Sequence, residues 1–246
     1  MVMAIVMVIY VFRSKYFKNH LRNFSIKSIS RIRMKRIFKL GAPTAMQYTF
    51  EVGAFSAAAI LIGTIGVVEQ AAHQIAINLA AATYMMASGI SAAATIKTGN
   101  NYGKNNYSSL RLSAISSYHV VLIFMGITAL IFVGLNKYLP YIFSTDEAVI
   151  HIAAGLLLIA AVFQLFDGAQ VVGLGILRGM GDVNIPTFIT FTAYWLIGLP
   201  IGYLLGIKYN FGAEGIWFGL TFGLLTASIL LFIRFQMLTK KLELQS

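Results

Sequence analysis

The chain has 246 residues, of which 58% are hydrophobic and only 11% are charged. Its mean hydropathy of +0.77 exceeds what a water-soluble domain of this length needs, so the composition indicates a polytopic membrane protein. The formal net charge is +11, and cysteine is absent, which excludes disulfides and thiolate metal sites.

The chain begins with a short apolar run, residues 1–12, followed by a strongly basic segment, residues 13–39. The apolar run is too short to span a bilayer alone, so we interpret it as the tail of an incomplete transmembrane helix. The basic segment interleaves ten Lys and Arg residues with Ile and Phe. This pattern favours an interfacial helix on the cytoplasmic leaflet, with a plain solvated linker as the alternative. Because the basic run adjoins the membrane, we expect no nucleic-acid partner.

Six further apolar segments are long enough to cross a membrane at about 20 residues per helix. They cover residues 41–63, 71–96, 113–135, 149–176, 185–206 and 213–235. Proline cannot donate a backbone hydrogen bond, so Pro200 is expected to break the fifth segment. The prediction is an all-α fold, with a six-helix transmembrane bundle over residues 40–236 and a cytoplasmic tail at 237–246.

The positions of the basic residues predict how the bundle is oriented. With residues 13–39 in the cytoplasm and alternating spans, seventeen of the 19 Lys and Arg residues fall on the cytoplasmic side. Only Lys137 and Lys208 fall on the opposite side. Such an imbalance is the positive-inside signal of an integral membrane protein. A bacterial inner membrane, with the basic loops in the cytoplasm, is the expected location.

Two carboxylates interrupt the apolar segments, Glu51 in the first and Asp167 in the fourth. A charge near the bilayer centre costs about 2.5–3.5 kcal/mol even on a lenient scale, so such residues commonly have a function. Glu51 lies twelve residues after Lys39, and Asp167 lies eleven residues before Arg178. At 1.5 Å per residue, both lie roughly 16–18 Å from the cytoplasmic charges. Two acids at one depth could line one cavity that handles cations.

Amide side chains recur near these acids and on the second span. Each amide costs free energy in lipid, so we expect them to face the bundle interior. There they either line a cavity or hold helices together by hydrogen bonds. The amides are Gln47, Gln74, Asn78, Gln164 and Gln170.

Several short motifs follow one another in a fixed order along the chain. They are LGAP at 40–43, AAHQI at 71–75, SAAAT at 91–95, LRG at 177–179 and GLP at 198–200. Together with the six-span topology, they resemble the multidrug and toxic compound extrusion (MATE) antiporters. The resemblance covers about residues 37–236 and is to the C-terminal lobe, helices seven to twelve. Acids in helices seven and ten are typical of the NorM-type branch.

The resemblance implies secondary active efflux of cationic or amphiphilic organic compounds, in antiport with Na⁺ or H⁺ and with no other cofactor. It implies that Glu51 and Asp167 bind the coupling cation, either Na⁺ or H⁺. It places Gln74 in the substrate cavity and Asp146 at its outer mouth. Phe163 stands where some family members have a Tyr, so one hydroxyl ligand is missing. The full set of expected cavity residues is Gln47, Gln74, Asn78, Asp146, Phe163 and Gln164.

Family transporters have two lobes, and the sequence accounts for one. The expected partners are therefore an N-terminal lobe or a second chain, besides the bilayer, the coupling cation and small organic cations. Two alternatives stay open: a polysaccharide or lipid flippase of the same superfamily, and an inactive partner lobe. A flippase for pyrophosphate-linked lipids would need basic residues in its cavity, and the predicted spans contain no Lys or Arg.

An enzyme is a further alternative, because residues 179–182 match the GxGD signature of intramembrane aspartyl proteases. Those enzymes need two aspartates facing each other inside the membrane. Asp182 falls in a short cytoplasmic loop, and Asp167 lies about 22 Å away along the adjoining helix. The four histidines are scattered over four segments, so we do not expect an enzyme.

Overall fold

The computed structural model describes residues 2–14 and 30–243, and the chain divides into a unit ending at Ala42 and a unit beginning at Pro43. In the first unit, helix α1 (Val2–Arg13) exposes its apolar side chains along the described part. The basic segment expected at 13–39 lies partly outside the described residues. Its last part is helical, because helix α3 (Arg31–Gly63) begins at Arg31.

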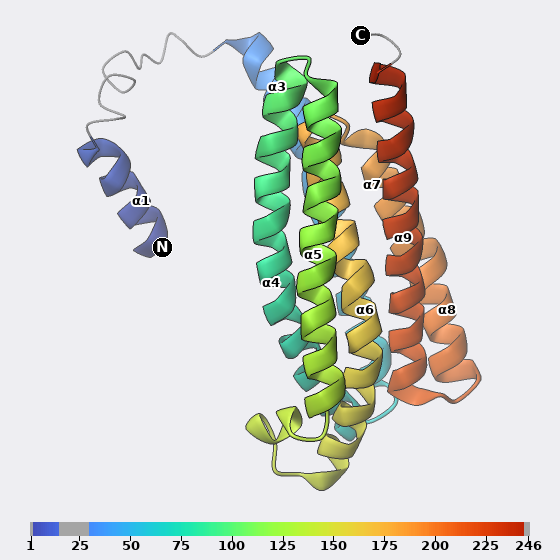
Figure 1. The fold of residues 1–246 in the computed structure, drawn as a ribbon. Helices are drawn as coiled ribbons and strands as arrows, with labels where there is room; N and C mark the ends of the chain where they lie inside the picture. Colours follow the sequence, from blue (N-terminus) through green and yellow to red (C-terminus); the bar gives the residue numbers. More distant parts are fainter. Residues whose placement is uncertain (1, 15–29, 244–246) are drawn as a thin grey trace. The chain divides into compact units, whose positions relative to one another are not determined.

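Six helical segments are long and apolar enough to cross a membrane (Figure 1). Among the described residues there is no β-strand, so the predicted all-α, six-span fold is confirmed. The six are α3, α4 (Val67–Gly103), α5 (Tyr107–Leu135), α6 (Glu147–Gly179), a composite segment Asn184–Lys208, and α9 (Gly212–Glu243).

Most of these helices extend beyond the apolar segments that define them in the sequence. Their ends carry polar and basic side chains, which tolerate water and are good helix formers, so the helix continues past the hydrocarbon region. Side chains cap two of the helices. The Asn106 side chain accepts from the Ser109 N–H at 3.1 Å at the start of α5, and Asp146 accepts from the Ala148 N–H at 2.9 Å at the start of α6.

Turns alternate between the two ends of the bundle, as the topology prediction requires. The α4–α5 and α6–α7 turns lie at the end where α9 finishes, and the α5–α6 connection, with its short helix η2 (Leu139–Ile142), lies at the other end (Figure 1). Left-handed backbone closes the tight turns: Gly181 has φ of 79°, Asn105 of 56° and Asn210 of 59°. Glycine and asparagine adopt this conformation most readily.

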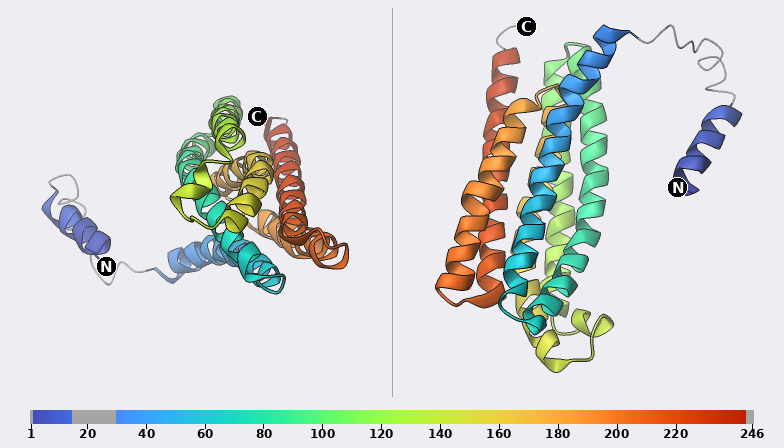
Figure 2. Two further views of the ribbon diagram at one scale, coloured as in Figure 1. Left: turned by 90° about the horizontal axis from the view of Figure 1, so that it is seen from below. Right: turned by 180° about the vertical axis from the view of Figure 1, so that it is seen from behind.

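Helix α6 is the centre of the bundle and contacts α4, α5 and α9 (Figure 2). Small side chains bring α4 and α6 close together. The Ser91 hydroxyl donates to the Val171 carbonyl at 2.6 Å, and the Thr95 hydroxyl lies 2.8 Å from the Gly175 carbonyl. A Cβ on Gly175 would lie 2.7 Å from the Ser91 carbonyl oxygen. Such close packing of small and hydroxyl residues is a typical source of helix association in membranes.

The composite fifth segment remains helical through Pro200, so the predicted break is wrong. It consists of α7 (Asn184–Phe191), the π-helix η3 (Thr192–Gly198), α8 (Leu199–Tyr203) and the π-helix η4 (Leu204–Lys208). The Leu199 N–H donates to the Tyr194 carbonyl, five residues back. A π-turn widens the helix, which makes room for the proline ring and leaves fewer backbone groups without partners.

Glycines form a close contact between this segment and α9. Gly198, Gly202 and Gly206 face Gly215, Gly219 and Gly223, and a Cβ on most of these glycines would meet backbone atoms of the opposite helix. A Cβ on Gly223, for example, would lie 2.9 Å from the Ala193 carbonyl oxygen. The two backbones are therefore in direct contact. We call this contact between the six glycines the glycine seam.

Candidate functional site

A cavity of about 520 Å³ opens between α3, α4 and α6. Its lining is mostly aliphatic and aromatic, with a few polar groups among them. Glu51 from α3 and Asp167 from α6 both belong to this lining, so two carboxylates far apart in sequence meet in one cavity. The lining residues are Tyr48, Glu51, Val52, Phe55, Ser56, Ala59, His73, Gln74, Ile77, Ala80, Ala81, Tyr84, Met85, Phe163 and Asp167.

The two carboxylates are buried, with exposed fractions of 6% for Glu51 and 4% for Asp167. Among the described residues, neither accepts a hydrogen bond from a protein group nor forms an ion pair. They are close enough for their charges to repel one another. A buried carboxylate without a protein partner is costly, so this pair is suited to an external cation.

A positive charge lies near Glu51, toward the end of the bundle where α6 finishes. The Arg178 guanidinium is 5.6 Å from the centre of the Tyr48 ring, and Tyr48 lies one helical turn before Glu51 on α3. The positive charge of Arg178 attracts the Glu51 carboxylate. Arg178 belongs to the last turn of helix α6, which continues to Gly179. The predicted apolar segments contain no Arg, whereas the longer helix α6 includes Arg178.

Aromatic rings form the wall behind the acids. The Phe55 ring lies 6.0 Å from Phe163 and 5.9 Å from Tyr194, and Phe163 lies 5.3 Å from Trp217. These are ordinary distances for edge-to-face and tilted aromatic pairs. Phe55 and Phe163 line the cavity and give it an apolar aromatic surface, which Tyr194 and Trp217 support from behind.

Three of the expected cavity residues lie at or near this site. Gln74 and Phe163 line the cavity. Asn78 is one turn further along α4, where its Oδ1 accepts from Gln74 Nε2 at 3.4 Å, and it is not part of the lining. Met85, about two turns further along α4, also lines the cavity.

The other expected cavity residues do not line it. Gln47 turns away from Glu51 and donates to the Val183 carbonyl and to Thr187 Oγ1, both at 3.0 Å, which ties α3 to the start of α7. Gln164 is fully buried, and its Oε1 accepts from the Thr128 hydroxyl at 3.1 Å. These contacts match the alternative interpretation of the amides, as groups that hold helices together.

Two further acids have contacts outside the cavity. Asp146 caps α6 and is exposed. Asp182, the aspartate of the GxGD match, forms an ion pair with Arg234 at 2.7 Å and so links the α6–α7 turn to α9. Neither carboxylate contributes to the cavity described above.

Four polar cavity residues were missed by the sequence reasoning: Tyr48, Ser56, His73 and Tyr84. Helix periodicity could have indicated Tyr48, because it lies three residues before Glu51 and so shares its face. His73 directly precedes Gln74 in the AAHQI motif. Its inward direction depends on the packing of α4 against α9, which the local sequence does not specify.

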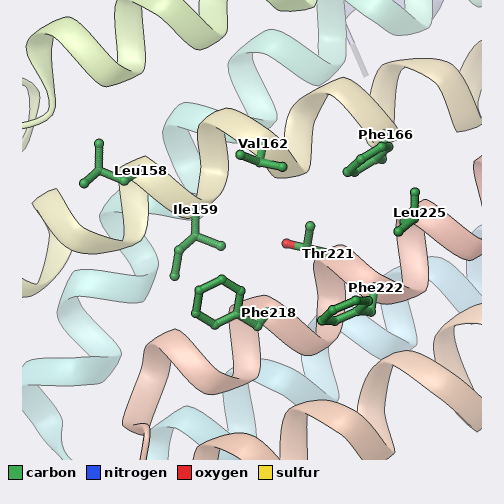
Figure 3. A pocket seen from close by; sticks show the side chains of 8 residues that line it. All are labelled: Leu158, Ile159, Val162, Phe166, Phe218, Thr221, Phe222 and Leu225. Atoms are coloured by element: carbon green, nitrogen blue, oxygen red, sulfur yellow. The ribbon is translucent and has the colours of Figure 1, made fainter.

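A second, apolar hollow of about 440 Å³ lies between α6 and α9 (Figure 3). Phe166, Phe218 and Phe222 line it, with Thr221 as its single polar side chain. Phe166 lines this hollow and is not part of the lining of the cavity that contains the two acids. Because the hollow contains no charge, it lacks the means to select a cation.

Comparisons with known proteins agree with this architecture. The MatE family model matches residues 43–204. The multidrug resistance protein MdtK of Yersinia enterocolitica is 40% identical over 212 residues, which are 85% of this chain and 46% of that relative. MdtK of Yersinia pseudotuberculosis is 39% identical over the same shares. The chain thus spans about half the length of the curated relatives it matches.

Solved structures show the same fold. The crystal structure of the eukaryotic MATE transporter AtDTX14 has a TM-score of 0.87 at 21% identity, covering 98% of this chain and 55% of that one. An outward-facing multidrug resistance MATE family transporter has a TM-score of 0.82 at 18% identity, covering 98% and 54%. The predicted resemblance and the predicted integral membrane location are therefore confirmed. The chain belongs to the MATE family and spans one lobe of such a transporter.

Proposed function

We propose that this chain is the C-terminal lobe of a secondary active transporter that exports organic cations in exchange for Na⁺ or H⁺. The MdtK relatives, named as multidrug resistance proteins, support multidrug efflux rather than an enzymatic activity. The chain spans about half of those relatives, so the proposal includes an N-terminal lobe that completes the cavity.

The observation that carries the proposal is the pair Glu51 and Asp167. The two carboxylates come from different helices, share one largely apolar cavity and have no hydrogen-bond partner among the described residues. Intramembrane carboxylates that face a cavity mark ion and substrate pathways in transporters. The surrounding rings of Phe55, Tyr84 and Phe163 supply the apolar and aromatic surface that an amphiphilic cation needs.

Transport follows from competition for these carboxylates. A coupling cation and an organic cation both lower the cost of two buried negative charges, and both cannot be fully satisfied at once. Entry of the coupling cation neutralises the site and weakens organic-cation binding, which releases the compound. Each net charge that moves inward across 100 mV contributes about 2.3 kcal/mol. That energy supports a roughly 40-fold concentration gradient.

The cavity has ligands for either coupling ion. A proton needs only one carboxylate. A sodium ion prefers several oxygens, and Ser56 and Gln74 line the cavity together with the two acids. Either ion is therefore compatible with this set of oxygens.

The charge of the cavity argues against a flippase for pyrophosphate-linked lipids. Its described lining has two carboxylates and neither Lys nor Arg, so it attracts cations and repels a pyrophosphate. The nearby Arg178 lies over the Tyr48 ring and near Glu51, where its charge is partly balanced.

Efflux from drug-sensitive cells tests the proposal. The chain is expressed together with the N-terminal lobe of an MdtK relative, and ethidium efflux is followed under an imposed Na⁺ or H⁺ gradient. One gradient should drive efflux, and Glu51→Gln or Asp167→Asn should slow it at least about tenfold, because each removes a buried charge that binds the cation.

Glu147→Gln is the matched control, because Glu147 is an exposed carboxylate at the start of α6 that contacts Tyr141 and does not line the cavity. It should leave the efflux rate unchanged. If neither gradient drives efflux in the assembled pair, the chain is an inactive partner lobe. If efflux persists in both cavity variants, the carboxylates have another role.

A further inference from the structure

The cavity contains a histidine whose protonation pattern is determined by a neighbouring tryptophan. His73 and Trp217 are both buried, with exposed fractions of 2% and 0%. The Trp217 indole Nε1–H donates to the Nδ1 of His73 at 3.1 Å, and the two ring centres are 5.9 Å apart at an angle of 68°. The bond connects α4 to α9, and His73 lines the cavity that contains Glu51 and Asp167.

The chemistry of the two rings determines where the imidazole proton lies. An indole nitrogen can only donate, so the histidine nitrogen that faces it must be an acceptor and carry no proton. A neutral imidazole has one proton, which must then be on the other nitrogen, Nε2. An imidazolium would direct an N–H against the indole N–H, so the bond is compatible only with the neutral ring.

The Nε2–H group is available to a bound molecule. Within the described part of the chain, no protein group forms a hydrogen bond with this nitrogen, and it is not among the enclosed polar atoms that lack a partner. His73 lines the cavity, and Nε2 is the imidazole nitrogen that Trp217 leaves free for a substrate to contact. The charged groups that share this cavity are Glu51 on α3 and Asp167 on α6.

We propose that His73, held as the Nε2–H tautomer by Trp217, is a neutral hydrogen-bond donor that selects organic cations carrying an acceptor group near the charge. This proposal rests on the proposed transport function and specifies its substrate class. The two carboxylates attract the positive charge, and the imidazole recognises an ester, amide or ether oxygen. Trp217 is a positioning residue, because it acts on the substrate only through His73.

A donor of this kind changes selectivity more than overall affinity. A cation with a suitable oxygen satisfies the Nε2–H, whereas a purely hydrocarbon cation leaves it without a partner in a low-dielectric cavity. The net value of one hydrogen bond corresponds to a preference of roughly three- to tenfold. The preference should disappear when the donor is removed.

Nitrogen NMR tests the tautomer directly. The chain is co-purified with the N-terminal lobe after labelling its four histidines with ¹⁵N, and His73→Gln assigns the His73 signals. The expected spectrum at neutral pH has one protonated Nε2 and one unprotonated Nδ1. In Trp217→Phe the ring remains but the indole donor is lost, and a mixture of tautomers should appear. A protonated Nδ1 in the wild type would overturn the proposal.

Binding tests the selectivity. The probes are an acylcholine and an alkyltrimethylammonium ion of equal chain length, which differ in the ester group. Each probe displaces bound ethidium, and the change in ethidium fluorescence gives its affinity. The wild type should bind the acylcholine three- to tenfold more tightly. His73→Phe should reduce this ratio to about one. His73→Gln should keep a preference, because its amide can accept from Trp217 and still donate to the substrate.

The outcomes separate this proposal from the proposed function. A ratio near one in the wild type, or an unchanged ratio in His73→Phe, overturns the role of His73. A merely structural histidine would alter both affinities together and leave their ratio unchanged. If neither gradient drives efflux, the transport function fails, whereas the tautomer is still read from the His73 signals.

Discussion

At the scale of residues, the site depends on the balance between two acids and their surroundings. Glu51 and Asp167 repel one another, and Arg178 near Tyr48 offsets part of the negative charge. The aromatic rings beside the two acids hold few water molecules, so the carboxylates are poorly hydrated. The electrostatic attraction between a cation and this carboxylate pair is therefore stronger than it would be at an exposed carboxylate pair.

The sequence predicted the acids because charge in an apolar segment is conspicuous, whereas it could not decide the direction of the amides. Gln47 lies four residues before Glu51 and so near the same helix face, yet its side chain reaches Val183 and Thr187. Gln164 likewise pairs with Thr128. Which neighbour an amide finds depends on tertiary packing, and these partners come from distant parts of the chain.

The first prediction concerns Asp146, which was expected at the outer mouth and caps α6 in the structure. Asp146→Ala should lower the free energy of unfolding by about 1 kcal/mol, because the Ala148 N–H loses its acceptor. Asp146→Asn is the matched control, since asparagine caps equally well without a charge. Thermal unfolding of the purified protein measures both. An equal loss in the two variants would assign the effect to the charge and not to the cap.

At the scale of elements, the glycine seam explains how the irregular fifth segment and α9 stay together. Backbone contact replaces interlocking side chains along Gly198, Gly202 and Gly206. The sequence predicted six spans, and each predicted range lies within one of the six long helical segments, because hydropathy reports what lies in lipid. It did not predict the π-turns, because the accommodation of Pro200 depends on hydrogen bonds five residues apart, which leave no compositional signal.

The second prediction concerns the seam. Gly219→Ala should destabilise the protein by about 1–3 kcal/mol, because its Cβ would meet the backbone of Gly202 and Gly198. Gly126→Ala is the control within α5, where a Cβ meets nothing within 4 Å. It should be neutral or stabilise by about 0.5–1 kcal/mol, since alanine favours helix. Denaturation curves that show similar stability for the two variants would contradict the seam.

At the scale of the whole molecule, the six spans place the two acids between the ends of the bundle. The turns alternate as the distribution of Lys and Arg predicts, with Lys104 at one end and Lys137 at the other. The cavity that contains the acids opens between α3, α4 and α6, and under the proposed function an N-terminal lobe completes it.

The third prediction concerns orientation. The chain has no cysteine, so single cysteines report position without a background signal. Lys104→Cys should react with an impermeant maleimide only from the cytoplasmic side, and Thr145→Cys only from the opposite side, because the distribution of Lys and Arg predicts that the basic loops lie in the cytoplasm. Both positions are exposed. Labelling of the two sites from the same side would exclude the six-span topology.

Under the proposed function, organic and coupling cations compete for the Glu51–Asp167 pair. The most direct measurement is the equilibrium affinity of the two assembled lobes for ethidium at increasing concentrations of Na⁺ or H⁺. One of these ions should raise the apparent Kd for ethidium in proportion to its concentration, and this dependence should be lost in the Glu51→Gln, Asp167→Asn double variant. An ethidium affinity that neither ion changes, or one that responds equally in the double variant, would contradict this competition.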